Sequence, residues 1–164
     1  MPQSAPLPES FGSPHLSIRV RGVIVRDGKL LMDRTHHWER EPFYWLPGGG
    51  MEPGETSAEC LRRELMEEAA VEIEVGRLVY VSENLYVESG DYRHELILYR
   101  LAQIVSGPSG PPSDERMHEW HAPGRQPGPL LPAEVAAELA IDFEQGFRRP
   151  ILHLVTDNRP DSDG

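Results

Sequence analysis

The sequence predicts an α/β fold in which a mixed β-sheet lies between helices. Two observations support this. Strand-like segments bounded by turn residues occur both before and after an amphipathic helix, and a second amphipathic helix follows near the C-terminus. Strands on both sides of a helix along the chain are typical of a sheet covered by helices. The 164 residues suffice for one domain with a core. We expect a loose arm over residues 1–14, a single domain over residues 15–158 and an acidic tail over residues 159–164.

The first expected element is a β-hairpin over residues 15–35. Ile18 and Val20 alternate with arginines, as in a strand with one apolar face. The pair Asp27-Gly28 is a strong turn signal between two apolar segments. The run "FYWLP", residues 43–47, predicts a short aromatic strand that ends at the proline.

A glycine loop and a helix follow this strand. Gly48, Gly49 and Gly50 permit positive φ angles and a close approach of the backbone to a ligand. Thr56 and Glu59 fit the Thr-x-x-Glu capping box, which predicts a helix over residues 57–69.

Further strands and a second helix complete the expected domain. The segments "VEIEVGRLVYVSENLYVE" and "RHELILYRLAQIV" read as two strands joined by a turn at Gly90-Asp91. The run "MHEWHA" predicts one more short strand. In residues 133–147, Val135, Leu139 and Phe143 recur every four residues, which indicates a helix with one buried face.

Composition narrows the possible function classes. A net charge of −11 argues against a general nucleic-acid or anionic-membrane surface, but a metal ion can still bridge an anionic substrate to acidic residues. The only cysteine is Cys60, which excludes an intramolecular disulfide and favours a reducing compartment. No apolar run reaches membrane-spanning length, and residues 1–14 do not resemble a signal peptide. We therefore expect a cytoplasmic protein without membrane partners, and the sequence leaves homodimer formation open.

Three glutamates near the end of the first helix point to a metal site. Glu64, Glu67 and Glu68 share one arc of the helix at the negative end of its dipole. Each like-charge pair there costs about 0.2–0.5 kcal/mol. A solvent-exposed acidic face is the common alternative, but a helix selected only for stability would carry lysine or arginine at these positions. Mg²⁺, or Mn²⁺ in its place, would relieve the repulsion, since both prefer oxygen ligands. Together with the glycine loop, the acids predict a metal–diphosphate site.

The same stretch resembles the signature of the Nudix hydrolases, the MutT-like pyrophosphohydrolases. That signature reads G-x5-E-x7-R-E-U-x-E-E-x-G-U, where U is apolar. Eight of its nine specified positions match this chain, namely Gly49, Glu55, Arg63, Glu64, Leu65, Glu67, Glu68 and Val71. Ala70 occupies the remaining position, where the family has glycine. Because alanine tolerates positive φ poorly, we expect the helix to end differently from that of the family.

The resemblance implies an α/β/α sandwich with a mixed sheet. It also implies Mg²⁺-dependent hydrolysis of a nucleoside diphosphate linked to a group X, with water attacking phosphorus. By position, Glu64, Glu67, Glu68 and the Gly48 carbonyl resemble metal ligands. Arg63 resembles a catalytic-helix residue that pairs with Glu55. The proton acceptor varies within the family, and the candidates here are Glu64, Glu115 and Glu119.

Substrate contacts and substrate identity are less defined by the sequence. Candidates for contacting the small-molecule nucleotide are Gly49, Gly50, Trp38, Tyr44, Glu115 and Glu119. His36 and His37 beside Trp38, and Trp45 and Trp120 as stacking residues, are further candidates, with loop or core roles as the alternative. ADP-ribose, nucleoside di- or triphosphates and dinucleoside polyphosphates all remain open. The rival function class is a non-catalytic Nudix domain that senses a nucleotide or binds a partner. Isoprenoid-diphosphate isomerisation is a third class, but it would need a reactive cysteine.

Overall fold

The computed structural model describes residues 15–35, 41–108 and 117–159. Within them the order of elements is β1 (His15–Arg26), β2 (Lys29–Arg34), β3 (Tyr44–Trp45), β4 (Gly48–Gly50), α1 (Ser57–Ala69), β5 (Glu72–Glu88), β6 (Asp91–Ser106), β7 (Met117–His121), α2 (Ala133–Gln145) and β8 (Leu152–Asp157). The expected arm and nearly all of the acidic tail lie outside the described residues. None of the described helices is long and apolar enough to span a membrane.

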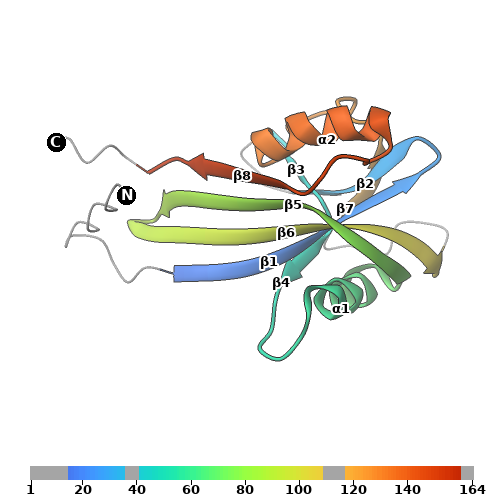
Figure 1. Cartoon of the computed structure of the whole chain (residues 1–164), viewed down its shortest axis with the longest axis horizontal. Coiled ribbons are helices and arrows are strands. Elements are labelled where there is room, and N and C mark those ends of the chain that lie inside the picture. Colours follow the sequence, from blue (N-terminus) through green and yellow to red (C-terminus); the bar gives the residue numbers. More distant parts are fainter. Residues whose placement is uncertain (1–14, 36–40, 109–116, 160–164) are drawn as a thin grey trace.

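The described strands form one mixed sheet in the order β3-β2-β1-β6-β5-β8, with β4 paired to β1 and β7 paired to β2. β1 is parallel to β6 and β5 is parallel to β8, while the other pairs are antiparallel. The two helices cover opposite faces of the sheet (Figure 1). This arrangement confirms the predicted α/β/α architecture.

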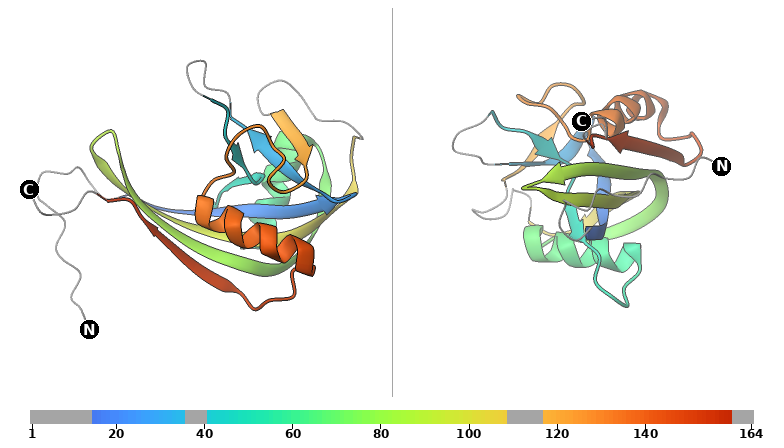
Figure 2. Two further views of the ribbon diagram at one scale, coloured as in Figure 1. Left: turned by 90° about the horizontal axis from the view of Figure 1, so that it is seen from above. Right: turned by 90° about the vertical axis from the view of Figure 1, so that its left-hand side faces the viewer.

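Two apolar clusters hold the helices against the sheet. The cluster beneath α2 is rich in aromatic residues and includes Tyr44, Tyr80, Tyr99, Val135 and Leu139. The cluster beneath α1 is mainly aliphatic and includes Val20, Ile24, Leu31, Leu61 and Leu65. The N-terminal part of β1 and the hairpin of β5 and β6 extend beyond both helices (Figure 2).

A buried polar contact also fixes α2. The Tyr80 hydroxyl donates to Asp142 at 2.7 Å, and the Arg149 Nε donates to the same carboxylate at 2.6 Å. Asp142 is only 3% exposed, so both of its partners are needed to offset the cost of burying the charge. The fully buried Tyr80 lies on β5, so the contact ties the helix directly to the sheet.

Most expected elements are present, with two differences. Asp27 and Gly28 both take positive φ in the turn between β1 and β2. The capping box is complete, because the Thr56 hydroxyl accepts from the Glu59 amide while the Glu59 carboxylate accepts from the Thr56 amide. The predicted glycine loop, however, is a short strand paired with β1, and β8 was not predicted. β8 lies along β5 at one edge of the sheet.

The end of α1 differs from the expectation for Ala70. This alanine takes the left-handed conformation, with φ 50° and ψ 32°, and its amide donates to the carbonyls of Leu65 and Met66. The helix therefore ends as it would with glycine, and the expected difference is not found. A residue with a Cβ pays about 1–2 kcal/mol for this conformation.

Candidate functional site

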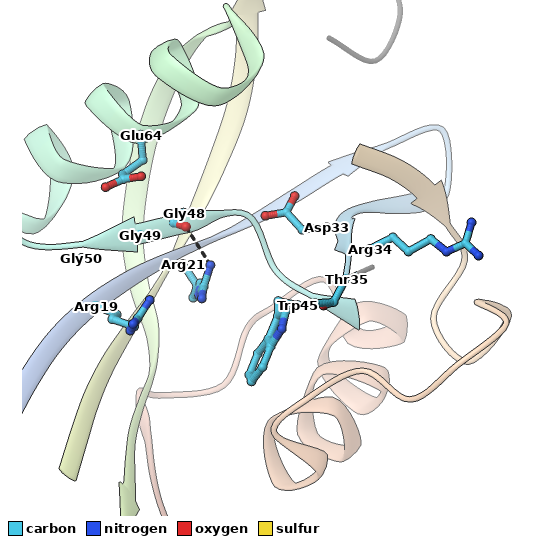
Figure 3. Close-up of a pocket in the computed structure, with 10 residues that line it drawn as sticks. All are labelled: Arg19, Arg21, Asp33, Arg34, Thr35, Trp45, Gly48, Gly49, Gly50 and Glu64. Atoms are coloured by element: carbon cyan, nitrogen blue, oxygen red, sulfur yellow. Dashed lines mark hydrogen bonds between the residues drawn. The ribbon is translucent and has the colours of Figure 1, made fainter. Parts of the chain in front are cut away.

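A pocket of about 440 Å³ opens beside the glycine strand β4 (Figure 3). This volume lies within the range of small-molecule sites. Its walls come from four strands and one helix, and the lining residues are Arg19, Arg21, Asp33, Arg34, Thr35, Trp45, Gly48, Gly49, Gly50 and Glu64.

The missing side chain of Gly49 makes room for Glu64. A Cβ built on Gly49 would lie 2.3 Å from the Glu64 carboxylate, far inside van der Waals contact. Gly48 has a different role, since its φ is 134° and a Cβ there would meet the Val20 carbonyl oxygen at 2.1 Å. The backbone of β4 and the Glu64 carboxylate of α1 therefore approach each other closely.

Arg63 joins the loop to the helix through several acceptors. Its Nη2 donates to Glu55 at 2.7 Å and to the Gly50 carbonyl at 3.0 Å, and its Nη1 donates to Glu64 at 2.9 Å. Hydrogen bonds from Arg63 lower the pKa of Glu55 to about 2, and the same pair raises the pKa of Arg63. The ion pair implied by the signature is thus present, and Arg63 also holds the Glu64 carboxylate.

The three acids of α1 do not converge in this structure. Among the described residues, no group of three or more His, Cys, Asp or Glu side chains is placed to hold a metal ion. Glu67 is 60% exposed and pairs with Arg63 at 3.4 Å. Glu64 alone of the three lines the pocket. The carboxylate oxygens still fit a hard divalent cation. The Glu64 carboxylate fills the space left by Gly49, and the other two acids, Glu67 and Glu68, lie within one turn of Glu64 on the helix.

The predicted Gly48 ligand already has a partner. Its carbonyl accepts from Arg21 Nη1 at 2.7 Å, and the same nitrogen donates to the Leu46 carbonyl at 3.1 Å (Figure 3). A carbonyl oxygen has two lone pairs, so this bond leaves one for a cation. Arg21 also lies 5.8 Å from the centroid of the Trp45 ring.

Three pocket arginines were not among the residues that the sequence singled out. Arg19 pairs with Glu95 at 3.0 Å, and Arg34 lies 3.6 Å from Glu119. Arg19 and Arg21 alternate with apolar residues along β1, a pattern that a solvent-facing strand shows equally well. Only the pairing of β1 with β4 places these arginines at the site.

A buried carboxylate–histidine pair at the pocket was also missed. His118 on β7 lies opposite Asp33 on β2, and its Nδ1 is 2.5 Å from the Asp33 carboxylate. Both residues are at least 94% buried, since Asp33 is 6% exposed and His118 is 4% exposed. The two residues are 85 positions apart, so no local motif indicated the contact.

The other residues that the sequence suggested as substrate contacts lie partly in the core, partly at the pocket and partly outside the described residues. Tyr44 is fully buried and donates its hydroxyl to Glu119 at 3.1 Å, whereas its neighbour Trp45 lines the pocket. Burial opposes ionisation of Glu119, but hydrogen bonds from His121 and Tyr44 lower its pKa overall, and it does not line the pocket. This arrangement does not favour Glu119 as a proton acceptor. Trp38, His36, His37 and Glu115 lie outside the described residues.

Two further residues behave as packing groups. Cys60 is fully buried in the α1 cluster, and burial raises the pKa of its thiol to about 12, which disfavours a reactive thiolate. Trp120 packs against the same cluster and lies 5.0 Å from the Arg26 guanidinium. Neither residue lines the pocket.

The comparisons with known proteins all indicate one family. A model of the NUDIX domain matches residues 16–142. A human protein named 8-oxo-dGDP phosphatase NUDT18 is 29% identical over 153 residues, which are 86% of this chain and 46% of that protein. An Escherichia coli K12 protein named CTP pyrophosphohydrolase is 30% identical over 133 residues, which are 80% of each. The chain spans about half the length of several curated relatives that it matches.

Solved structures agree with the fold. The crystal structure of a MutT NUDIX hydrolase from Burkholderia pseudomallei superposes with a TM-score of 0.61 at 26% sequence identity. The match covers 76% of this chain and 97% of that chain.

Proposed function

Because the chain belongs to the Nudix family, we propose that it is a pyrophosphohydrolase that cleaves a nucleoside diphosphate derivative by attack of water on phosphorus. The family match covers the whole of α1 and every residue that lines the pocket. Relatives named for phosphatase and pyrophosphohydrolase activities support the same reaction class.

One observation supports this proposal most directly. A chain with a net charge of −11 places three arginines, Glu64 and a glycine strand around a single pocket. A substrate that carries several phosphoryl groups needs positive charge around it, and guanidinium groups bind phosphate through paired hydrogen bonds. The acids beside them suit a divalent cation that would neutralise the remaining phosphate charge.

The chain's own residues have distinct roles in this reaction. Glu64 would hold Mg²⁺ together with a glycine carbonyl, and Glu67 and Glu68 would complete the site after Glu67 leaves Arg63. When bound, Mg²⁺ supplies positive charge beside the diphosphate and Lewis-acid activation of water. Arg63 holds Glu64 and the loop in place through the contacts described above. Glu64 and Asp33 are the described carboxylates that line the pocket, so one of them is proposed to accept the proton of the water.

A nucleotide panel with product identification tests the proposal. Nucleoside di- and triphosphates, ADP-ribose and dinucleoside polyphosphates would be incubated with Mg²⁺ or Mn²⁺, and with EDTA as the control. In ¹⁸O-water, one phosphoryl product should carry one label within a single turnover. Nucleotide binding without any hydrolysis would contradict the proposal and indicate a sensor domain. Label that appears only after a second turnover would exclude direct attack by water.

A further inference from the structure

Two arginines on β1 lie across the glycine strand from Glu64 (Figure 3). In the register of β1 and β4, Arg19 is opposite Gly50 and Arg21 is opposite Gly48, whereas Gly49 is opposite Val20. Side chains alternate between the faces of a strand. The missing Cβ of Gly49 points to Glu64, so Arg19 and Arg21 project from the opposite face of this strand pair. The pocket therefore has an acidic side and a guanidinium side.

The guanidinium side is held in place by neighbouring groups. Arg21 is fixed by its bonds to the Leu46 and Gly48 carbonyls and by the Trp45 ring. Arg19 is anchored by the Glu95 carboxylate. The Arg19 side chain is 40% exposed, whereas the Glu95 side chain is 16% exposed. The two cations are thus arranged before any ligand arrives, which reduces the ordering cost of binding an anion.

We propose that Arg19 and Arg21 form a second anion subsite, so that the preferred substrate carries at least one phosphoryl group beyond the diphosphate that is cleaved. This inference rests on the proposed function, because the cleaved diphosphate is assigned to the Glu64 side. Nucleoside triphosphates and dinucleoside polyphosphates have the required group. The terminal ribose of ADP-ribose is uncharged, and placing it there would desolvate two guanidinium groups without giving them a charged partner.

Matched adenosine substrates provide the first test. We would measure kcat/KM for ATP, diadenosine tetraphosphate and ADP-ribose at two salt concentrations. ATP or diadenosine tetraphosphate should exceed ADP-ribose by about tenfold or more, the scale expected for one charge-assisted hydrogen bond. The preference should shrink as salt screens the exposed Arg19 charge. The two favoured substrates differ in their distal group, so they also separate a terminal phosphate from a bridging one. Equal or higher efficiency with ADP-ribose would overturn the inference.

Two substitutions of the same ion pair should act in opposite directions. Arg19→Gln removes a cation and should lower kcat/KM for the phosphate-rich substrates by about tenfold, with little effect on ADP-ribose. Glu95→Gln removes the competing carboxylate and should raise kcat/KM for the same substrates. Arg125→Gln is the matched control, since this exposed loop arginine lies outside the pocket and its loss changes the net charge equally. Changes of the same sign in Arg19→Gln and Glu95→Gln would overturn the inference.

Binding of tripolyphosphate separates this inference from the proposed function. Isothermal titration with tripolyphosphate and pyrophosphate, in EDTA, needs no turnover. Without a metal ion on the Glu64 side, both anions should bind through Arg19 and Arg21, and Arg19→Gln should weaken the binding of each by about tenfold. Binding with this pattern but no hydrolysis of any nucleotide would overturn the proposed function alone. Hydrolysis without any effect of Arg19→Gln on substrate preference or tripolyphosphate binding would overturn the subsite alone.

Discussion

Gly49→Ala should lower the proposed hydrolase activity by about a hundredfold without unfolding the protein. The backbone at Gly49 is not in the left-handed region, so alanine meets no conformational penalty there. The added Cβ would nevertheless lie 2.3 Å from the Glu64 carboxylate, and ordinary contact begins at 3.4 Å. The end of a flexible side chain can yield, so we expect the carboxylate to move by about 1 Å.

The expected loss of turnover follows from this displacement. A misplacement of about 1 Å in a catalytic group can cost about a hundredfold in rate, which corresponds to about 2.7 kcal/mol in activation free energy. The Arg63–Glu64 bond of 2.9 Å should also be strained or broken. The free energy of unfolding should change much less, because the methyl group displaces a side chain that lies in a pocket wall and not in the apolar core.

The neighbouring glycines provide the controls. Gly50→Ala makes the same chemical change where a Cβ meets nothing within 4 Å, so Glu64 keeps its position and turnover should fall much less. Gly48→Ala should prevent stable folding, because both its φ and the Val20 carbonyl oxygen exclude a side chain. The assay is kcat with saturating Mg²⁺, paired with thermal melting in EDTA. Equal kcat values for Gly49→Ala and Gly50→Ala would refute the reasoning.

Four further predictions concern the helix end, the loop, the metal requirement and the proposed metal ligand Glu64. Ala70→Gly should raise the free energy of unfolding, measured by urea denaturation, by about 1 kcal/mol, because relief of the left-handed backbone strain should exceed the added entropy of the unfolded chain. A lower urea midpoint for the variant would contradict this. Arg63 lowers the pKa of Glu55 from its ordinary value of 4.5 to about 2. The ion pair therefore stabilises the fold fully when the pH is above the ordinary pKa, and this contribution is lost as the pH falls towards about 2. Glu55→Gln should therefore flatten the dependence of stability on pH in that window, and an unchanged slope would exclude the assignment. Wild-type turnover should vanish in EDTA, return with Mg²⁺ or Mn²⁺ and rise towards alkaline pH. Glu64→Gln should lose most of kcat with either metal ion, and near-normal kcat would remove Glu64 from the site.

Local signals in the sequence account for the helix and the hairpins. The capping box at Thr56 and Glu59 accounts for the start of α1, and the apolar stripe through Leu61 and Leu65 accounts for its buried face. The Asp27-Gly28 turn likewise determines the first hairpin. These features depend on neighbours within about four positions, which is the range over which a sequence can be read directly.

The parts of the site that the sequence did not predict depend on strand pairing. Asp33 and His118 meet because β7 pairs with β2, and Arg19 and Arg21 reach the pocket because β4 pairs with β1. Both aromatic residues of β3, Tyr44 and Trp45, were candidates for contacting the substrate, but only the sheet register determines which of them faces the core. β8 was not predicted, although Leu152 and Leu154 alternate along it and pack against the cluster beneath α2.

The alternation along β2 and β3 has a practical consequence for redesign of specificity. Met32 and Tyr44 belong to the buried cluster under α2, while the next residue in each strand, Asp33 and Trp45, lines the pocket. A mutagenesis library restricted to position 45 would thus vary one wall of the pocket while leaving the packing that carries α2 and the buried Asp33–His118 pair unaltered. Insertions or deletions in either strand would exchange the two sets, because a shift by one residue turns every side chain to the other face. A directed-evolution campaign on this scaffold should accordingly randomise side chains and hold strand length constant.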